Sequence, residues 1–96
     1  MRHFSARELQ SYLAKSEIAP LLLDVREEWE YEYCHIAGSI LIPMGQVPAQ
    51  LEELDKEREI VVICHHGIRS RHIGIYLEHA GFDNVINLEG GVEQWA

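Results

Sequence analysis

Blocks of apolar residues recur along the chain at lengths that predict short strands. An apolar run at 21–25, interrupted only by Asp24, and a continuous one at 60–63 are typical of strands covered on both faces, as in a parallel sheet. A third strand is expected at 39–43, where Pro43 ends it because proline has no N–H to give to a neighbouring strand. A fourth is expected at 85–88. The segments between these strands are long enough for helices.

Apolar residues at helical spacing occupy those segments. Ser5 to Glu8 has the Ser-x-x-Glu form of a capping box, which predicts a helix over 6–15, and Gly81 is placed to end a later helix. Strands that alternate with helices imply an α/β domain with a mostly parallel sheet, in which sites form at the carboxyl ends of the strands. The other expected helices cover 27–33, 47–54 and 70–80, and one more begins after the glycine pair 90–91.

Length and charge narrow the class of protein. The 96 residues, of which 47% are hydrophobic and 25% charged, are enough for one hydrophobic core, so we expect a single domain over 1–96. Asp and Glu outnumber Lys and Arg by 16 to 8, and a net charge of −8 argues against a nucleic-acid surface. The apolar runs are too short to cross a bilayer, and no signal-type segment follows Met1. These features predict a soluble, cytoplasmic protein with neither a membrane nor a nucleic acid as partner.

One of the two cysteines stands at the carboxyl end of a predicted strand. Cys34 and Cys64 are too few for a disulfide framework, so both are expected as free thiols. Cys64 follows the strand at 60–63 and opens a loop that leads to Ser70, the expected N-cap of the next helix. Unpaired N–H groups and the dipole at the start of a helix stabilise an anion, and a thiolate is such an anion.

The loop residues support the interpretation of Cys64 as an activated nucleophile. Gly67 can take a positive φ and let the loop curl, so that successive N–H groups from His65 to Ser70 converge on the sulfur. Arg69 or a protonated histidine would add positive charge. The alternative is a buried cysteine that only ends a strand, beside a turn glycine and a surface arginine.

Three segments, in order along the chain, resemble rhodanese (thiosulfate sulfurtransferase) domains. The stretch CHHGIRS at 64–70 is similar to their catalytic loop. The stretch LLLDVREEWEYEYCHIAGSILIP at 21–43 is similar to the segment in which these domains have a strand, an Asp-x-Arg motif, a helix and a His-Ile motif. The stretch VINLEGGVEQW at 85–95 is similar to their closing double glycine and Trp. The resemblance implies a rhodanese-like α/β fold, with a central parallel five-stranded sheet and helices on both faces. It leaves open whether the chain is a whole protein or an excerpt truncated in its C-terminal helix.

The resemblance also implies a function. A sulfurtransferase of this family moves a sulfane sulfur from a thiosulfate-like donor to a thiol or cyanide through a persulfide, here on Cys64, without a cofactor or metal. The implied partners are a small donor, such as thiosulfate or a persulfide, and a thiol acceptor that is small or carried by a protein; the oligomeric state stays open. Arg69 is expected to attract the sulfonate of the donor, and Arg71 is the second candidate. His65 and His66 are expected to line the entrance to the loop. The expected substrate-binding residues are His65, His66, Gly67, Ile68, Arg69 and Ser70.

Residues upstream of the loop are expected to support it. Asp24 and Arg26 lie where a strand ends, and we favour a structural tie between them over a surface salt bridge, with His35 buried and hydrogen-bonded. Cys34 stands where the resembled domains usually have glycine. We favour the interpretation that Cys34 is a small buried residue that replaces another small one, rather than a second redox-active thiol.

Three other functions compete with this interpretation. Phosphatases that hold a Cys thiolate in a similar loop require Cys-x5-Arg, but counting from Cys64 the arginine position is occupied by Ser70, between Arg69 and Arg71. A zinc site built from Cys64 and the nearby histidines lacks the usual ligand spacing. The third alternative is a low-turnover sulfur relay or protein-binding module of a larger protein, and the sequence leaves it open.

Overall fold

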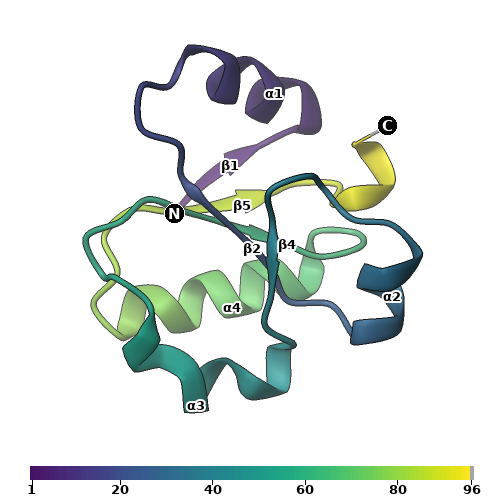
Figure 1. Ribbon diagram of the computed structural model, residues 1–96. Coiled ribbons are helices and arrows are strands. Elements are labelled where there is room, and N and C mark those ends of the chain that lie inside the picture. Colours follow the sequence, from purple (N-terminus) through teal and green to yellow (C-terminus); the bar gives the residue numbers. More distant parts are fainter. Residues whose placement is uncertain (96) are drawn as a thin grey trace.

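The computed structural model describes residues 1–95 and has the predicted α/β architecture (Figure 1). Five strands form one sheet in the order β1-β5-β4-β2-β3, and every neighbouring pair is parallel. Within the described residues, no helix is long and apolar enough to cross a membrane. The strands are β1 Arg2–Phe4, β2 Leu21–Asp24, β3 Ile40–Leu41, β4 Ile60–Ile63 and β5 Val85–Leu88. The helices are α1 Ala6–Lys15, α2 Glu28–Tyr33, α3 Val47–Gln50 and α4 Ile68–His79, with short 3-10 helices η1 Met44–Gln46, η2 Leu51–Glu53 and η3 Val92–Gln94.

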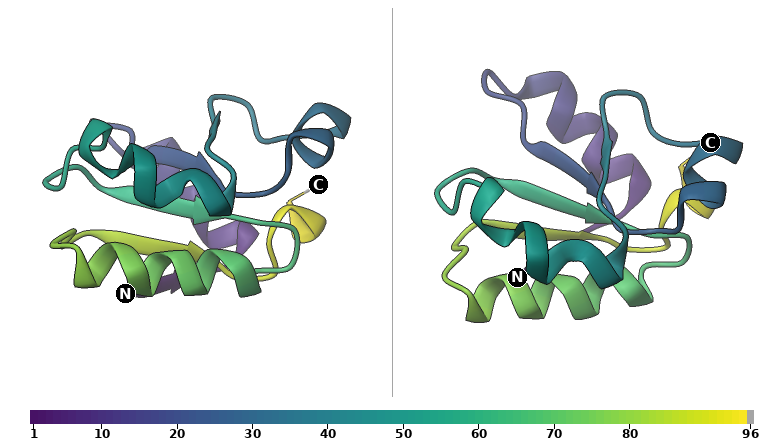
Figure 2. Two further views of the ribbon diagram at one scale, coloured as in Figure 1. Left: turned by 90° about the horizontal axis from the view of Figure 1, so that it is seen from below. Right: turned by 60° about the horizontal axis from the view of Figure 1, so that its bottom comes forward.

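Helices cover both faces of the sheet, with α1 on one face and α3 and α4 on the other (Figures 1 and 2). Because side chains alternate along a strand, β4 contributes to a core on each face. Val62 belongs to a cluster with Ile73 and Leu77 of α4, whereas Val61 belongs to a second cluster with Leu9 of α1. All of β4 is buried, which explains why its apolar run is unbroken.

The sequence located several elements correctly. The helix over 6–15 and the strands at 60–63 and 85–88 are confirmed with the expected bounds. At the start of α1, the Ser5 hydroxyl accepts from the Glu8 N–H at 3.1 Å, and the Glu8 carboxylate accepts from the Ser5 N–H at 2.9 Å. The capping box therefore forms as its pattern predicts.

Other predicted boundaries of helices and strands were wrong. Helix α4 begins at Ile68, so Gly67 rather than Ser70 occupies the N-cap position. The segment 39–43 holds only the two-residue strand β3, which lies at the edge of the sheet and pairs with β2 alone. The helix expected over 47–54 divides into α3 and η2. The pattern also did not predict β1, because this edge strand is three residues long and partly exposed.

The order of the strands determines what surrounds Cys64. β4 lies in the middle of the sheet between β2 and β5, and Cys64 follows its last residue. β2 ends at Asp24 and β5 ends at Leu88, so the segments that follow both strands emerge on either side of the cysteine. The carboxyl ends of parallel strands form one edge of the sheet, and this edge carries the candidate site.

Candidate active site

Cys64 lies at the base of the loop that joins β4 to α4. Its sulfur accepts hydrogen bonds from the backbone N–H groups of Gly67 at 3.0 Å and Ser70 at 3.3 Å. The Ser70 hydroxyl oxygen also lies 3.3 Å from the sulfur, and Cys64 is only 1% exposed. Two backbone amides therefore donate to a nearly buried sulfur, and such donors stabilise negative charge on it.

Gly67 gives the loop its curl. Its φ of 94° lies in the left-handed region, where a side chain would be strained. A Cβ there would lie 3.0 Å from the Gly90 nitrogen and 3.2 Å from the Leu88 carbonyl oxygen. The chain then enters α4 at Ile68, whose side chain is 59% exposed, and the first turn of the helix places the Ser70 amide at the sulfur.

Asn87 of β5 supports the loop from within the sheet, and the sequence analysis missed it. The Ser70 hydroxyl donates to the Asn87 side-chain oxygen, and the Asn87 side-chain amide donates to the Gly67 carbonyl at 3.4 Å. Ser70 and Asn87 are both buried. The available signal was an amide side chain inside the otherwise apolar strand at 85–88, because buried polar groups require partners.

The backbone of η3 holds the loop from the other side. The Val92 N–H donates to the Cys64 carbonyl at 2.9 Å, and the Glu93 N–H donates to the His65 carbonyl at 3.2 Å. Gly91 has a φ of 65°, and a Cβ there would collide with both of these carbonyl oxygens. The second glycine of the closing segment is therefore required by the close approach of two backbones.

Asp24 and Arg26 form a buried ion pair at the end of β2. Arg26 donates from Nη2 to Asp24 Oδ2 at 2.8 Å and from Nε to Oδ1 at 3.0 Å, and Nη2 also donates to the Cys34 carbonyl at 2.7 Å. The two residues are 0% and 2% exposed, so the alternative of a surface salt bridge was wrong. The pair joins the end of β2 to the end of α2.

Two expectations about the segment after α2 were also wrong. His35 is exposed rather than buried, although its Nδ1 lies 2.8 Å from the Tyr31 carbonyl oxygen and its ring stacks on the Tyr31 ring with centroids 3.9 Å apart. Cys34 is exposed as well. The reason is that α2 stands out from the sheet and buries none of its residues, so the two residues that follow it stay near the surface before Ile36 enters the core.

Arg69 is paired with a carboxylate. Its two terminal nitrogens each donate to one oxygen of Glu30, both at 2.8 Å. These hydrogen bonds from Arg69 lower the pKa of Glu30 to about 2. The pair connects α2 to α4 beside the loop, and an anion that approaches Arg69 must compete with Glu30.

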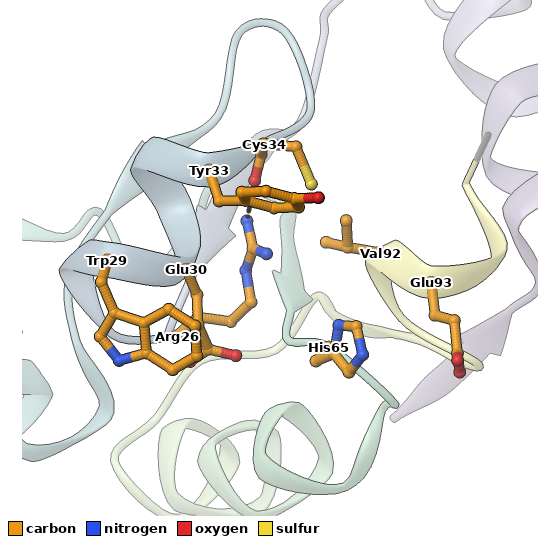
Figure 3. A pocket seen from close by; sticks show the side chains of 8 residues that line it. All are labelled: Arg26, Trp29, Glu30, Tyr33, Cys34, His65, Val92 and Glu93. Carbon is orange, nitrogen blue, oxygen red and sulfur yellow. Dashed lines mark hydrogen bonds between the residues drawn. The ribbon is translucent and has the colours of Figure 1, made fainter.

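A cavity of about 490 Å³ opens beside the loop (Figure 3). Helix α2 forms one wall with Trp29, Glu30 and Tyr33, and η3 forms the opposite wall with Val92 and Glu93 (Figure 3). The aromatic wall was not predicted as part of the site. Its signal in the sequence was the alternation of aromatic and acidic residues over 28–33, which places Trp29 and Tyr33 four positions apart.

Four of the six predicted substrate-binding residues divide between two cavities, and Arg69 and Ser70 line neither of them. His65 lines the larger one, whereas His66, Gly67 and Ile68 line a second cavity of about 300 Å³ together with Arg71. The two adjacent histidines therefore face different surroundings, although their ring centroids are 4.2 Å apart. From the sequence, both histidines were expected to line the same entrance to the site.

In the part of the chain that the structure describes, one group of side chains could hold a metal ion. His65, His66 and Glu93 bring ligand atoms within 4.8 Å of one another, and the His66 Nδ1 lies 2.9 Å from a Glu93 carboxylate oxygen. The group does not include Cys64, whose sulfur is hydrogen-bonded inside the loop. It therefore differs from the zinc site that the sequence raised as an alternative.

Comparison with known proteins identifies the family. Residues 5–96 match the model of the rhodanese-like domain, and the chain belongs to this family. GlpE of Coxiella burnetii, a thiosulfate sulfurtransferase, is 37% identical over 93 residues, which cover 97% of this chain and 82% of that protein. The "Putative sulfur carrier protein YrkF" of Bacillus subtilis is 43% identical over 74 residues, which cover 77% of this chain but only 40% of YrkF.

Solved structures agree with this assignment. A rhodanese-like domain protein from Staphylococcus aureus has a TM-score of 0.92 at 31% identity, with 100% of this chain and 92% of that chain covered. A rhodanese-related protein from Thermoplasma volcanium has a TM-score of 0.87 at 33% identity, with coverage of 99% and 90%. The expected rhodanese-like fold with its parallel five-stranded sheet is confirmed.

Proposed function

We propose that this protein is a sulfurtransferase that carries a sulfane sulfur as a persulfide on Cys64. The observation that carries the proposal is the pair of hydrogen bonds to the Cys64 sulfur from the Gly67 and Ser70 amides, at 3.0 and 3.3 Å. Donors already aimed at one atom stabilise its negative charge without rearranging during the reaction. The similarity to a named thiosulfate sulfurtransferase supports the same reaction class.

Each half-reaction breaks one S–S bond and forms one new bond to the transferred sulfur. In the first, the Cys64 thiolate attacks the sulfane sulfur of a donor such as thiosulfate, and the S–S bond of the donor breaks so that sulfite leaves with the electron pair. In the second, an acceptor thiolate or cyanide attacks the outer sulfur of the persulfide. The bond to Cys64 breaks, and its electron pair returns to the Cys64 sulfur. The electrons balance in each step, so the cycle itself consumes no oxidant or reductant.

Neighbouring loop residues have supporting roles in this proposal. The Ser70 hydroxyl accepts a hydrogen bond from the neutral thiol and is itself fixed by donating to Asn87, so it orients the sulfur while the two amides carry the negative charge. Arg69 attracts the sulfonate of a donor in competition with Glu30, because its side chain is already paired with that carboxylate. His65 and His66 contact the donor or acceptor from the two sides of the loop.

Mass spectrometry after treatment with thiosulfate tests the proposal. We expect one added sulfur, about 32 Da, on the peptide that contains Cys64. Cys64→Ser should remove both the added sulfur and the transfer to cyanide, while the far-UV circular dichroism spectrum stays that of a folded α/β protein. Cys34→Ser is the matched control and should keep the added sulfur. Full turnover by the Cys64→Ser variant, or a sulfur found only on Cys34, would refute the assignment.

A low-turnover sulfur relay is the second candidate, and the burial of Cys64 favours it. At 1% exposure, the sulfur is reached only by an acceptor that enters the loop. A relay would form the persulfide stoichiometrically but turn over with thiosulfate and cyanide well below the roughly 1 s⁻¹ at the lower end of common enzyme rates. Steady-state kinetics with these two substrates separates a relay from an efficient enzyme.

A further inference from the structure

Helix α2 presents two exposed aromatic side chains beside the proposed site. Trp29 and Tyr33 are four residues apart, so they lie on the same side of the helix, and they are 71% and 87% exposed. Both line the cavity of about 490 Å³ next to the loop (Figure 3). Large aromatic rings with this exposure, gathered in the wall of a cavity, are typical of a surface that binds a partner or ligand.

Carboxylates accompany these rings. Glu28 and Glu32 precede Trp29 and Tyr33 by one residue each, so they form a parallel row on the adjacent side of α2, and both are exposed. Among residues 1–95, neither of them takes part in an ion pair. Glu93 adds a further carboxylate on the opposite wall of the cavity (Figure 3).

The nearby arginines do not offset this charge. Arg26 is bound to the buried Asp24 at 2.8 Å, and Arg69 is bound through two nitrogens to Glu30. Each guanidinium is matched by a carboxylate, so the remaining carboxylates leave the mouth of the cavity negative. The net charge of the whole chain, −8, has the same sign. Such a mouth favours cations over anions of similar size.

We propose that the α2 face, defined as Glu28, Trp29, Glu32 and Tyr33, docks a cationic, cysteine-bearing segment of a partner protein that exchanges sulfur with Cys64. This inference rests on the proposed function and specifies the class of its protein substrate. A lysine or arginine beside the partner's cysteine lays its aliphatic stem on the two aromatic rings and brings its charge to the two carboxylates.

The size and position of the cavity fit such a segment. Its volume of about 490 Å³ lies within the range of roughly 300–1,000 Å³ that accommodates drug-sized groups, whereas cyanide and thiosulfate need far less. The cavity adjoins the loop through His65, the residue after Cys64, and through Val92, whose N–H binds the Cys64 carbonyl. The docked thiolate attacks the outer sulfur of the persulfide, and the electron pair of the broken bond returns to the Cys64 sulfur.

A second copy of this chain is a poorer occupant. It would bring the same exposed carboxylates to the interface and add a second net charge of −8, and like charges across an interface oppose association. A cationic partner turns the same carboxylates into attractive contacts. The charge of the surface therefore favours a different, basic protein segment.

Sulfur transfer to two matched peptides tests the proposal. The peptides carry one cysteine and differ only in its flanking residues, which are lysines in one and glutamates in the other; 2-mercaptoethanol serves as the small acceptor. Starting from the wild-type persulfide at low ionic strength, we expect the lysine peptide to react at least about tenfold faster than the glutamate peptide. Near 1 M salt the ratio should fall toward one, because salt screens exposed charges.

Variants locate the preference on α2. The double substitution Glu28→Lys and Glu32→Lys should abolish or invert the ratio between the two peptides. The substitutions Glu17→Lys and Glu57→Lys are the control, because they change the net charge by the same amount. Both positions are exposed and precede β2 and β4, at the amino ends of these strands and away from the site. This control pair should keep a clear preference for the lysine peptide. Trp29→Ser with Tyr33→Ser should slow the lysine peptide about tenfold relative to 2-mercaptoethanol, because the stacking surface is lost.

The outcomes separate the inference from the proposed function. Equal rates for the two peptides together with normal transfer to 2-mercaptoethanol would overturn the docking surface alone. An equal fall of the ratio in the two charge-reversal pairs would overturn it as well. Failure to form the Cys64 persulfide would remove the proposed function and the inference with it. A concentration-dependent dimer in sedimentation that Trp29→Ser abolishes would assign the face to a second copy and also overturn the proposal.

Discussion

The Cys64 loop and helix α2 border the same cavity but are built in opposite ways. In the loop, main-chain groups make the important contacts: the Gly67 and Ser70 amides bind the sulfur, and the Val92 amide binds the Cys64 carbonyl. On α2, side chains make the important contacts, and none of the residues of this helix is buried. The loop therefore tolerates few substitutions at its turns, whereas α2 can change its surface without disturbing the sheet. In our proposals the loop sets the chemistry and α2 selects the partner.

The largest expected effect on stability comes from breaking the link between α2 and the sheet that carries the loop. Arg26 ties Asp24, at the end of β2, to the Cys34 carbonyl at the end of α2. Arg26→Ala leaves the Asp24 carboxylate buried without its partner, and we expect a loss of about 3–5 kcal/mol in the free energy of unfolding. Urea denaturation measures this loss. The double variant Asp24→Asn with Arg26→Met is the control and should recover much of the stability, because it buries no unpaired charge.

A slightly smaller loss is expected when the loop alone is disturbed. Gly91→Ala places a Cβ against the carbonyl oxygens of Cys64 and His65, at a φ that already disfavours a side chain. We expect a loss of about 2–4 kcal/mol in the free energy of unfolding and a decrease in persulfide formation. Gly45→Ala is the matched control, because no heavy atom of residues 1–95 outside its immediate chain neighbours lies within 4 Å of its Cβ position and its φ is not positive. Equal stability of the two variants would show that the loop is not held as described.

The Glu30–Arg69 pair allows a test in which the pH dependence of stability is measured. The folded state lowers the pKa of Glu30 to about 2 from its usual 4.5, so the pair stabilises the protein fully above pH 4.5 and progressively less as the pH falls toward 2. Glu30→Gln should cost about 1 kcal/mol at pH 7, and the difference between wild type and variant should shrink over this range. Urea denaturation at several pH values measures it. A difference that stays constant from pH 7 to pH 2 would contradict the assigned pKa.

The same substitution should have a still smaller effect on the use of thiosulfate. Glu30→Gln frees the two Arg69 nitrogens and removes one negative charge from the cavity wall. We expect the KM for thiosulfate to fall by about threefold, with kcat changed less, because the change acts on anion binding. Glu78→Gln, which removes an equal charge from α4 away from the cavity lining, is the control for net charge. A KM unchanged in both variants would show that Arg69 does not meet the donor.

The sequence predicted the sheet better than the site. The strands at 60–63 and 85–88 are buried on both faces, so their apolar runs were unambiguous, and the Cys64 loop carried its own motif. Asn87, 17 residues from Ser70, and Glu30, 39 residues from Arg69, are brought to the loop only by the packing of the sheet and helices. The exposure of Cys34 and His35 depends on how far α2 stands out from the sheet, and no local pattern encodes that distance.

The contrast in exposure between the two cysteines has a practical consequence for labelling. Cys34 lies on the surface, whereas Cys64 is 1% exposed at the base of its loop. A bulky maleimide or fluorescent iodoacetamide should therefore modify Cys34 first, even if Cys64 is the better nucleophile. A probe attached in this way would report on the rim of the cavity. A thiol count made with such reagents would miss Cys64, the thiol that we propose carries the sulfur.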